Sequence, residues 1–526
     1  MNTTKRYSIV ITTVLLGLFC TTASFSQIKQ SHRFEFERKS IDEDFNIISL
    51  KKEGLAIVEG KNKYKAGSRT WEVIVLDTAL KQKEIIEFDV RNENRLIGYD
   101  YSTGAVHLLY QKNEINGYMD LLSLSLTGDK KIDRYELKPE ITYRLTHFYK
   151  IGENFILAGV VGREPAILLY NPSGDNIKVL PGFFQKQTEL MDIQINLNKT
   201  FNTLLIDKSN RDNQNVIFRT FDPEGKLLLE DATIIDKGIE LQSGICSTLE
   251  KEDLLVLGNW GKLNSKQANG FYAIPVNPYE EKKIDWTYFG LLDHYLDYLK
   301  PRKAAAIREK TQKAIEKGTT PEFVNYIMPH RIIEHDQGFL LLAESFQPSS
   351  NNSQSSNSYY TPYFAAPNMH HFPRYGYYDS RNSPYGYGDE PVKEIKKIQS
   401  VVIAFDHTGA VLWDYGVKFD NIKTSDIEQV SDFYLEKDSL HFLYKKDSEI
   451  RIKSINLDDG ESIERAEKIK LNDSYDVIRM ERTQEGSVKH WFDQSFYVWG
   501  YQSIRNSEKG DFRNREVFYI NRLVIE

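Results

Sequence analysis

The feature that most constrains the fold of this chain is a loose repeat of roughly fifty residues, running eight times from Phe45 to the C-terminus. Each unit holds four short apolar runs separated by turn residues, except the last, which holds three. The runs are rich in Ile, Val, Leu, Phe and Tyr, which favours strands over helices. The units span residues 45–90, 95–137, 143–180, 190–229, 239–289, 324–413, 430–469 and 475–525.

The turns between these runs recur in phase with the repeat. Asn171-Pro172-Ser173-Gly174 and Asp222-Pro223-Glu224-Gly225 occupy the same place in successive units. Gly supplies positive φ angles and Asn or Asp hydrogen-bonds its own turn, so these are tight hairpin connections. Four-stranded units repeated around a ring predict an all-β fold, a single eight-bladed β-propeller. Seven blades is the alternative count, and a sandwich or several small β domains would give a similar list of strands.

One alternating run has no unit of its own. Arg33–Glu37 alternates polar and apolar residues near the N-terminus, whereas the eighth unit lacks its fourth run. We therefore expect this N-terminal strand to pair with Val517–Ile525 and to close the last blade. Closure of this kind would leave no long strand edge unpaired.

Residues 1–26 have the pattern of a cleaved signal peptide. Lys5 and Arg6 precede the apolar run Ile9–Phe19, which is too short to span a bilayer, and small residues precede a cleavage point at Gln27. The pattern predicts export to the periplasm or the outside of the cell, with residues 27–526 forming the propeller domain. Cys20 raises the alternative of a lipoprotein, although Phe19 is an unsuitable residue before a lipidated cysteine.

The net charge limits the kinds of partner that we expect for this chain, and the cysteine count limits the disulfides that it can form. The formal charge is −7, and removing the signal segment removes two cations and no acids. A mildly acidic chain argues against nucleic acid, which basic surfaces bind. No later apolar stretch approaches the length of a transmembrane helix. Cys246 is the only cysteine of the mature chain, so we expect a small buried residue rather than a disulfide. One closed ring also predicts a monomer.

Two long insertions adjoin the sixth unit. In the first, residues 291–323, the apolar stripe Leu292, Tyr295, Leu296 and Leu299 predicts a helix before Pro301. The Ala- and Lys-rich segment Arg302–Lys317 predicts a second helix that ends at Gly318.

The second insertion, residues 347–397, is of low complexity. Its first part is mostly Ser and Asn, and its second part is rich in Tyr, Pro and Gly, which predicts disorder or a lid. Tyrosines suit contacts with sugars, peptides and protein surfaces. The candidate partner-binding residues are Tyr359, Tyr360, Tyr363, Tyr375, Tyr377 and Tyr378. The alternative is a tolerated insertion without a role.

The segment Ala404-Phe405-Asp406-His407-Thr408-Gly409-Ala410-Val411-Leu412-Trp413 resembles the tryptophan-docking motif of quinoprotein-type propellers. The resemblance covers about ten residues of one blade. It implies that Trp413 packs against the neighbouring blade, and Asp406 and Gly409 are its structural partners in the turn. It implies packing and not a quinone cofactor.

No motif for catalysis or metal binding is present. The chain lacks G-x-S-x-G, H-E-x-x-H, a P-loop and an intact EF-hand, and neither His370-His371 nor the pair His330 and His335 has useful ligand spacing. We therefore predict no catalytic, cofactor-binding or metal-binding residue, and no cofactor.

Two classes of function remain open on the sequence. The first is a non-enzymatic, secreted or periplasmic propeller that binds or scaffolds a cell-envelope protein or a surface polymer. The alternative is a periplasmic glycan-active enzyme, a hydrolase or lyase, with carboxylates in the central channel. Two or three carboxylates with an arginine at the channel mouth would favour the enzyme.

Overall fold

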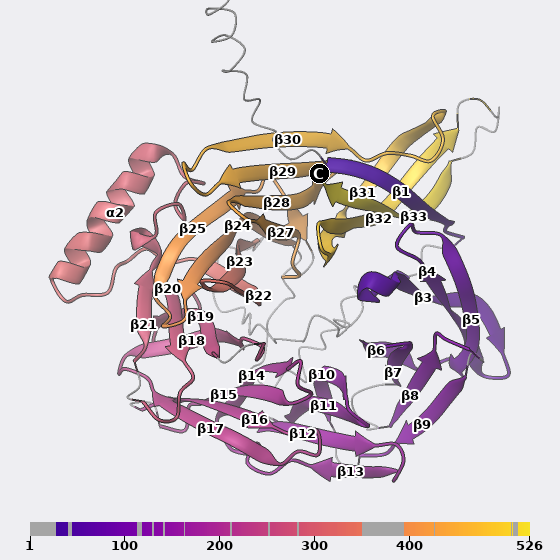
Figure 1. The fold of residues 1–526 in the computed structure, drawn as a ribbon, viewed down its shortest axis with the longest axis horizontal. Coiled ribbons are helices and arrows are strands. Elements are labelled where there is room, and N and C mark those ends of the chain that lie inside the picture. Colours follow the sequence, from indigo (N-terminus) through magenta and orange to yellow (C-terminus); the bar gives the residue numbers. More distant parts are fainter. Residues whose placement is uncertain are drawn as a thin grey trace, which may run out of the picture.

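Eight β-sheets form a closed ring in the computed structural model (Figure 1). The structure describes residues 28–526 apart from 40–44, 113–117, 129–130, 140–142, 163, 211–212, 251–252, 281–282, 350–393, 425–426, 507 and 509–513. Each sheet has four strands, and one carries a fifth short strand. The prediction of an eight-bladed β-propeller is confirmed.

Blades one to four follow the chain without long insertions. Blade one holds β2 (Phe45–Ser49), β3 (Leu55–Lys65), β4 (Ser68–Leu76) and β5 (Gln82–Arg91), with η1 (Lys51–Glu53) after β2. Blade two holds β6 (Arg95–Ser102), β7 (Ala105–Gln111), β8 (Met119–Ser125) and β9 (Ile132–Leu137). Blade three holds β10 (Arg144–Ile151), β11 (Asn154–Val161), β12 (Glu164–Asn171) and β13 (Asn176–Val179). Blade four holds β14 (Thr188–Ile195), β15 (Phe201–Asp207), β16 (Asn215–Phe221) and β17 (Leu227–Ile234).

Blades five to eight include both insertions. Blade five holds β18 (Ile239–Cys246), β19 (Leu255–Lys262), β20 (Gly270–Pro275) and β21 (Asp285–Tyr288), followed by η3 (Phe289–Leu291) and α2 (Pro301–Glu316). Blade six holds β22 (Tyr326–His335), β23 (Gly338–Ser349), β24 (Glu394–Asp406), β25 (Val411–Lys418) and the short β26 (Lys423–Thr424). Blade seven holds β27 (Ser431–Glu436), β28 (Ser439–Lys446), β29 (Glu449–Asn456) and β30 (Ser462–Lys468). Blade eight holds β31 (Asp476–Phe492), β32 (Ser495–Asn506), β33 (Arg515–Ile525) and β1 (Ile28–Glu37).

The N-terminal strand closes the ring as predicted. β1 pairs antiparallel with β33, with Phe34 opposite Ile520 and Glu37 opposite Val517. Arg33 reinforces the pairing because its guanidinium donates to the Asn521 side chain at 2.9 Å. The two ends of the described chain therefore share one blade.

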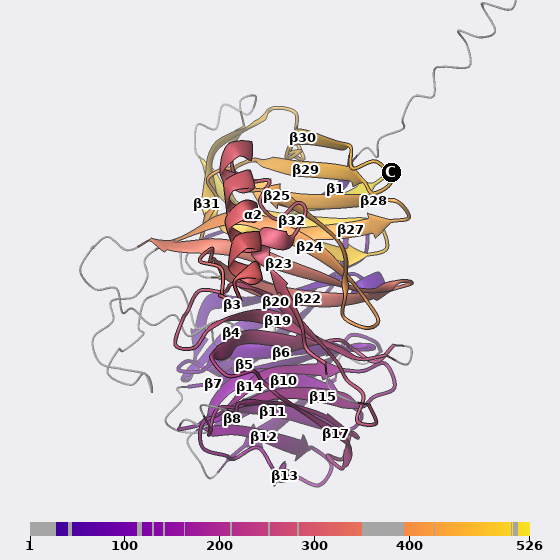
Figure 2. The same ribbon diagram turned by 90° about the vertical axis from the view of Figure 1, so that its left-hand side faces the viewer.

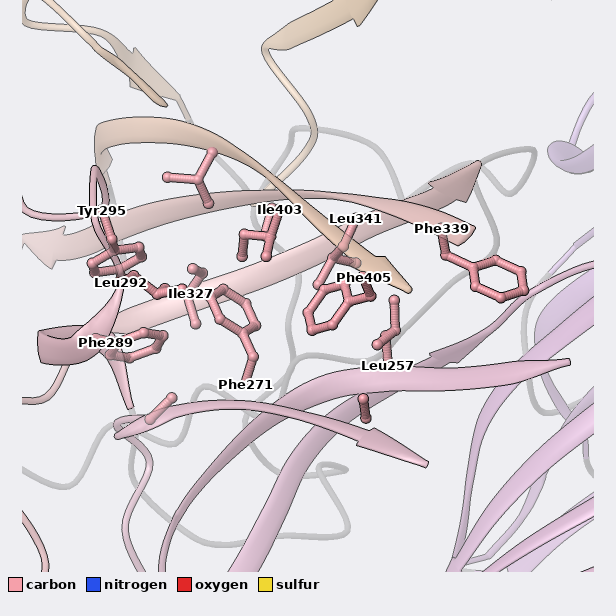
Figure 3. Close-up of a cluster of buried hydrophobic side chains, with 14 of the residues drawn as sticks. Leu257, Phe271, Phe289, Leu292, Tyr295, Ile327, Phe339, Leu341, Ile403 and Phe405 are labelled. Carbon is pink, nitrogen blue, oxygen red and sulfur yellow. The ribbon is translucent and has the colours of Figure 1, made fainter. Parts of the chain in front are cut away.

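The hydrophobic core is divided among the seams between blades. One apolar cluster lies at each of the eight seams. Strand alternation explains this arrangement, because Ala56 and Val58 face blade two whereas Leu55 and Ile57 face blade eight. Figure 3 shows the seam between blades five and six, where Phe271 meets Phe405. Each blade is thus stabilised by both neighbours.

Both insertions leave the ring on one face. Strands within a blade are antiparallel, so the β23–β24 connection and the β21–β22 crossover emerge on the same side. The edge-on view in Figure 2 shows α2 against the outer surface of the ring. The helical insertion is confirmed by α2, which matches the predicted Arg302–Lys317.

Two details of the insertions differ from the sequence prediction. The stripe from Leu292 to Leu299 forms turns rather than a helix, although Leu292, Tyr295 and Leu296 are buried. The predicted loop 347–397 overlaps two strands, since β23 and β24 remain paired as far as Ser349 and Glu394. Backbone pairing therefore continues at both ends of that loop, which its composition did not indicate.

Candidate functional site in the central channel

A group of ionisable side chains gathers where blades six, seven and eight meet around the channel. The first strands of these blades are β22, β27 and β31, and Figure 1 shows the first strands nearest the centre of the ring. Strands β23 and β24 of blade six contribute the remaining groups. The channel cluster, as we name it, comprises His330, Arg331, Glu344, Lys397, Asp432 and Lys489.

A buried ion pair anchors the channel cluster in blade six. Lys397 Nζ lies 2.9 Å from Glu344 Oε2, and neither side chain is exposed to solvent. The other carboxylate oxygen of Glu344 accepts the backbone N–H groups of Val430 and Ser431 at 3.0 and 2.9 Å. Burial opposes ionisation, but the charge of Lys397 and the contact with His330 hold the pKa of Glu344 well below its usual range. Glu344 therefore ties blade six to blade seven as a carboxylate.

A second ion pair links all three blades. Arg331 on β22 lies 2.5 Å from Asp432 Oδ1 on β27. Asp432 Oδ2 accepts the backbone N–H of His490 on β31 at 2.7 Å. The Nε of Arg331 is buried and has no hydrogen-bond partner among the described residues. That N–H is a donor that a buried water could satisfy, whereas the Arg331 side chain as a whole is 27% exposed.

Lys489 and Lys397 both donate to backbone carbonyls of the crossover between blades six and seven. Lys489 Nζ donates to the Gln429 carbonyl at 3.3 Å, and Lys397 Nζ donates to the Glu428 carbonyl at 2.5 Å. Burial lowers the pKa of Lys489, and the nearby carboxylates of Asp432 and Glu428 partly offset that shift. Among the described residues, the ammonium of Lys489 makes one long hydrogen bond, so it retains capacity to donate.

Tyr99 approaches the crossover from blade two. Burial raises the pKa of its phenol, and the carboxylate of Glu428 raises it further. Glu428 is exposed, and its charge acts on both Tyr99 and Lys489. Groups from blades two and eight thus face the same carboxylate.

Aspartates in three first strands make the same contact with the next blade. In each case a carboxylate oxygen accepts a backbone N–H from the following first strand. The pairs are Asp100 with Lys150, Asp192 with Cys246 and Asp432 with His490, at 2.7, 2.9 and 2.7 Å. Burial raises the pKa of Asp100 and of Asp192 to about 6. These carboxylates connect blades.

The channel cluster meets the sequence criterion for an enzyme in composition but differs in how its carboxylates are used. The carboxylates of Asp432, Glu428 and Glu344 all act on Lys489, and Arg331 pairs with Asp432. However, Glu344 and Asp432 already accept three or more hydrogen bonds or ion-pair contacts each. A general base needs an accessible lone pair, so the arrangement is better suited to holding a polar ligand than to proton transfer. No group of His, Cys, Asp and Glu within the described ranges is arranged to hold a metal ion.

The residues predicted from the sequence lie elsewhere. The six candidate tyrosines, Tyr359, Tyr360, Tyr363, Tyr375, Tyr377 and Tyr378, fall outside the described residues. Trp413 on β25 is partly buried against the apolar cluster between blades six and seven. Asp406 Oδ1 accepts the backbone N–H groups of Thr408 and Ala410, both at 2.9 Å. Gly409 has φ +91°, and a Cβ there would lie 2.8 Å from Ala273 Cβ, which explains glycine at this turn.

Sequence reasoning missed the channel cluster because its members are far apart in the chain. The polar residues at the blade-six insertion, Glu344 and Lys397, are 53 positions apart. One signal was available: Arg331, Asp432 and Lys489 interrupt apolar runs at first-strand positions. A charged residue in such a run predicts that the charge has an ion-pair partner or that it belongs to a binding or catalytic site.

Comparisons with known proteins identify no particular family. Neither a scan against protein-family models nor a search of the curated proteins finds a match. Among solved structures, the chain is similar to the polysaccharide lyase Uly1, with 9% identity, 95% of this chain and 100% of that chain covered, and a TM-score of 0.39. It is also similar to the WD40 domain of SCAP from fission yeast, with 9% identity, 94% and 98% covered, and a TM-score of 0.42. A europium-containing methanol dehydrogenase matches with 9% identity, 94% and 93% coverage, and a TM-score of 0.42.

The fold therefore defines this chain as a β-propeller protein. None of the helices in the described part of the chain is long and apolar enough to cross a membrane.

Proposed function

We propose that this protein is an exported binding module without catalytic activity, which holds a polar group of a cell-envelope protein or surface polymer at the channel cluster. The observation that carries the proposal is that Arg331 and Lys489 are partly exposed cations beside carboxylates that are already engaged. Donors that are fixed before binding lose little entropy when a ligand arrives. The pattern of residues 1–26 supports export.

The buried ion pairs give the channel cluster its rigidity. Glu344 and Lys397 are fully buried and Asp432 is nearly so, so their positions are set by the fold rather than by solvent. A ligand would meet Arg331 and Lys489 in defined positions. Such a site selects groups that accept hydrogen bonds, which include sugar hydroxyls, carboxylates and amide carbonyls.

A glycan-active enzyme is the second candidate, and Glu428 is the observation that favours it. Its carboxylate is exposed, and its charge acts on Lys489 and Tyr99, both of which have shifted pKa values. Groups with shifted pKa values concentrate at active sites.

One experiment separates the two candidates. The mature chain is incubated with neutral and acidic polysaccharides, binding is measured by affinity electrophoresis, and products are analysed by mass spectrometry. We expect binding without products. Lys489→Met should weaken binding roughly 10–100-fold, since a hydrogen bond to a charged group contributes about 1.5–3 kcal/mol. Glu428→Gln serves as the control and should bind normally. Products that disappear in Glu428→Gln would establish the enzyme instead.

The contribution of the inserted loop can be tested without disturbing the ring. Ser349 and Glu394 are paired across the β23–β24 hairpin, so a four-residue Gly/Ser turn can replace residues 350–393. This excision keeps Lys397 and its ion pair, which a wider excision of residues 347–397 would remove. Unchanged binding by the excised protein would limit the ligand contact to the channel cluster.

A further inference from the structure

The inserted helix α2 has a charge opposite to that of the chain that carries it. The segment from Lys300 to Lys317 holds seven basic and two acidic residues, whereas the whole chain has a formal charge of −7. Other blades are joined by short crossovers, and only three residues separate β5 from β6. The ring therefore does not need a helix here to connect its blades.

Four of the five basic residues of α2, together with Lys317 just after it, form one stripe. With 3.6 residues per turn, five side chains fall within about a third of the helix circumference. The basic stripe, as we name it, consists of Arg302, Lys303, Lys310, Lys313 and Lys317, all of which are exposed. Ala304 and Thr311 lie on the opposite side and are buried. The helix thus presents its cations to solvent along most of its length.

Most cations of the stripe have no neutralising partner. Lys313 pairs with Glu309 at 2.5 Å. The side chains of the other four form no ion pair or hydrogen bond with any residue that the structure describes. Arg308 lies off the stripe and donates to the Leu292 and Asp293 carbonyls of the crossover. The stripe therefore keeps its positive charge available to an external partner.

Packing against the ring holds the stripe in place. Gly290 of η3 lies so close to the helix that an added Cβ would be 2.1 Å from the Thr311 hydroxyl. Ala304 and Ile307 belong to the apolar cluster between blades five and six. The C-terminal end of α2 is capped by the Thr319 N–H, which donates to the Ala314 carbonyl at 2.8 Å. A helix fixed in this way offers a rigid row of charges.

The exposed side of α2 favours a hydrated polymer over a membrane. Ala305, Ala306 and Gln312 are the exposed uncharged residues of the helix after Pro301, and none of them is large and apolar. Surface helices that enter a bilayer need Trp, Phe or Leu on the side facing the lipid. The helix also presents no aromatic ring on which a nucleic-acid base could stack.

We propose that the basic stripe of α2 binds a linear anionic polysaccharide, one that carries a carboxylate or sulfate on most of its sugar residues. At 1.5 Å per residue, the five cations of the stripe span about 22 Å along the helix axis. Repeated anions on an extended polymer can meet several of them at once. This site lies on the outer surface of the ring (Figures 1 and 2), and its ligand does not depend on the channel cluster.

The test measures retention of the mature chain in affinity gels that contain polygalacturonate, neutral dextran or DNA, together with sedimentation on phosphatidylglycerol vesicles. Charge reversal by Arg302→Glu, Lys310→Glu and Lys317→Glu should weaken binding to polygalacturonate at least tenfold. Wild-type binding should fall as salt is raised, because the contact is electrostatic. A matched control, Lys186→Glu, Lys199→Glu and Lys226→Glu on blades three and four, changes the net charge equally and should bind within twofold of wild type.

Thermal melting of both triple variants shows whether they are folded, since the altered side chains are exposed in each. The proposal is overturned if the wild-type chain does not bind polygalacturonate at low salt, or if the helix variant binds it as well as the control variant does. Binding to vesicles alone, or to DNA as tightly as to polygalacturonate, would also overturn it. Loss of this binding leaves the channel test unaffected, so the two sites are judged separately.

Discussion

The seams between blades six and seven and between blades four and five use the same contact in different electrostatic settings. In the first, Glu344 accepts backbone N–H groups of blade seven beside the buried ammonium of Lys397. In the second, Asp192 accepts the backbone N–H of Cys246 at 2.9 Å, and no ion pair of Asp192 is found among the described residues. The pKa of Glu344 is lowered, whereas burial raises the pKa of Asp192 to about 6.

Glu344 and Asp192 both accept backbone N–H groups from the next blade, but Glu344 does so as part of a buried ion pair. A buried ion pair is expensive to desolvate and is often no more stable than an apolar replacement. A backbone N–H can be satisfied without a cation, as Asp192 demonstrates. The cations around Glu344 and Asp432 therefore point to a demand beyond holding blades together, which is consistent with a ligand site in that part of the channel.

The largest expected effect comes from removing the cation at the first seam. Lys397→Met leaves the Glu344 carboxylate buried without its counter-charge, so the free energy of unfolding should fall by about 3–5 kcal/mol at neutral pH. Since the native pKa of Glu344 lies below its unfolded value, its stabilising contribution is present above about pH 4.5 and is lost as the pH falls. Urea unfolding at pH 7 measures the change.

The matched control for this prediction is the double variant Glu344→Gln with Lys397→Met. It removes both charges while the amide oxygen still accepts a backbone N–H from blade seven, so it should be more stable than Lys397→Met alone. A single variant that loses less than about 1 kcal/mol would mean that the pair is solvated in solution.

The second seam should respond to pH in the opposite direction. Between about pH 4 and 6 the unfolded chain ionises Asp192 while the native chain keeps the proton, so stability falls as the pH rises. A shift of about two pH units corresponds to about 3 kcal/mol. Asp192→Asn should remove this slope, because an amide does not titrate. Its oxygen still accepts the backbone N–H of Cys246, so the contact between the blades is kept. Unfolding measured at pH 4.5 and 7 in both proteins tests it. An equal slope in the variant would assign the pH dependence to other groups.

The sequence predicted the ring because its repeat is local. Apolar alternation and turn residues such as Asp222 and Gly225 lie within one blade. Their repeat along the chain therefore predicts the number of blades. The closing strand followed from a missing run beside Val517–Ile525. The turns at Leu292–Leu299 were mistaken for a helix because their apolar side chains recur at helical spacing. These side chains are buried by packing against blades five and six, which does not require a helical backbone.

The channel cluster could not be predicted in the same way. Arg331 and Asp432 meet at 2.5 Å although 101 positions separate them, and their contact depends on where two first strands lie in the closed ring. Strand alternation gives the side on which a residue points, but not its depth along the channel. Bulges in the first strands, such as that between Pro329 and Arg331, shift this depth further.

The smallest expected effect concerns the apolar part of the two seams. Trp413 lies seven residues after Asp406, and Leu229 lies seven residues after Asp222, where the same turn contacts recur. Both side chains are partly buried at the seam that follows their blade. The docking motif implies that Trp413 packs against the neighbouring blade. Its partial exposure reduces the expected loss for Trp413→Ala to about 2 kcal/mol, below the 3–5 kcal/mol of a fully buried ring.

Trp413→Leu makes the first seam resemble the second and should lose only about 1 kcal/mol, since leucine retains much of the apolar contact. Leu229→Ala is the matched control at the second seam, with an expected loss of about 1–2 kcal/mol. Urea unfolding of the three variants gives the comparison. If Trp413→Ala costs no more than Leu229→Ala, the larger ring adds nothing to the seam between blades six and seven. The buried charges and the apolar cluster of that seam would then carry its stability without the docking tryptophan.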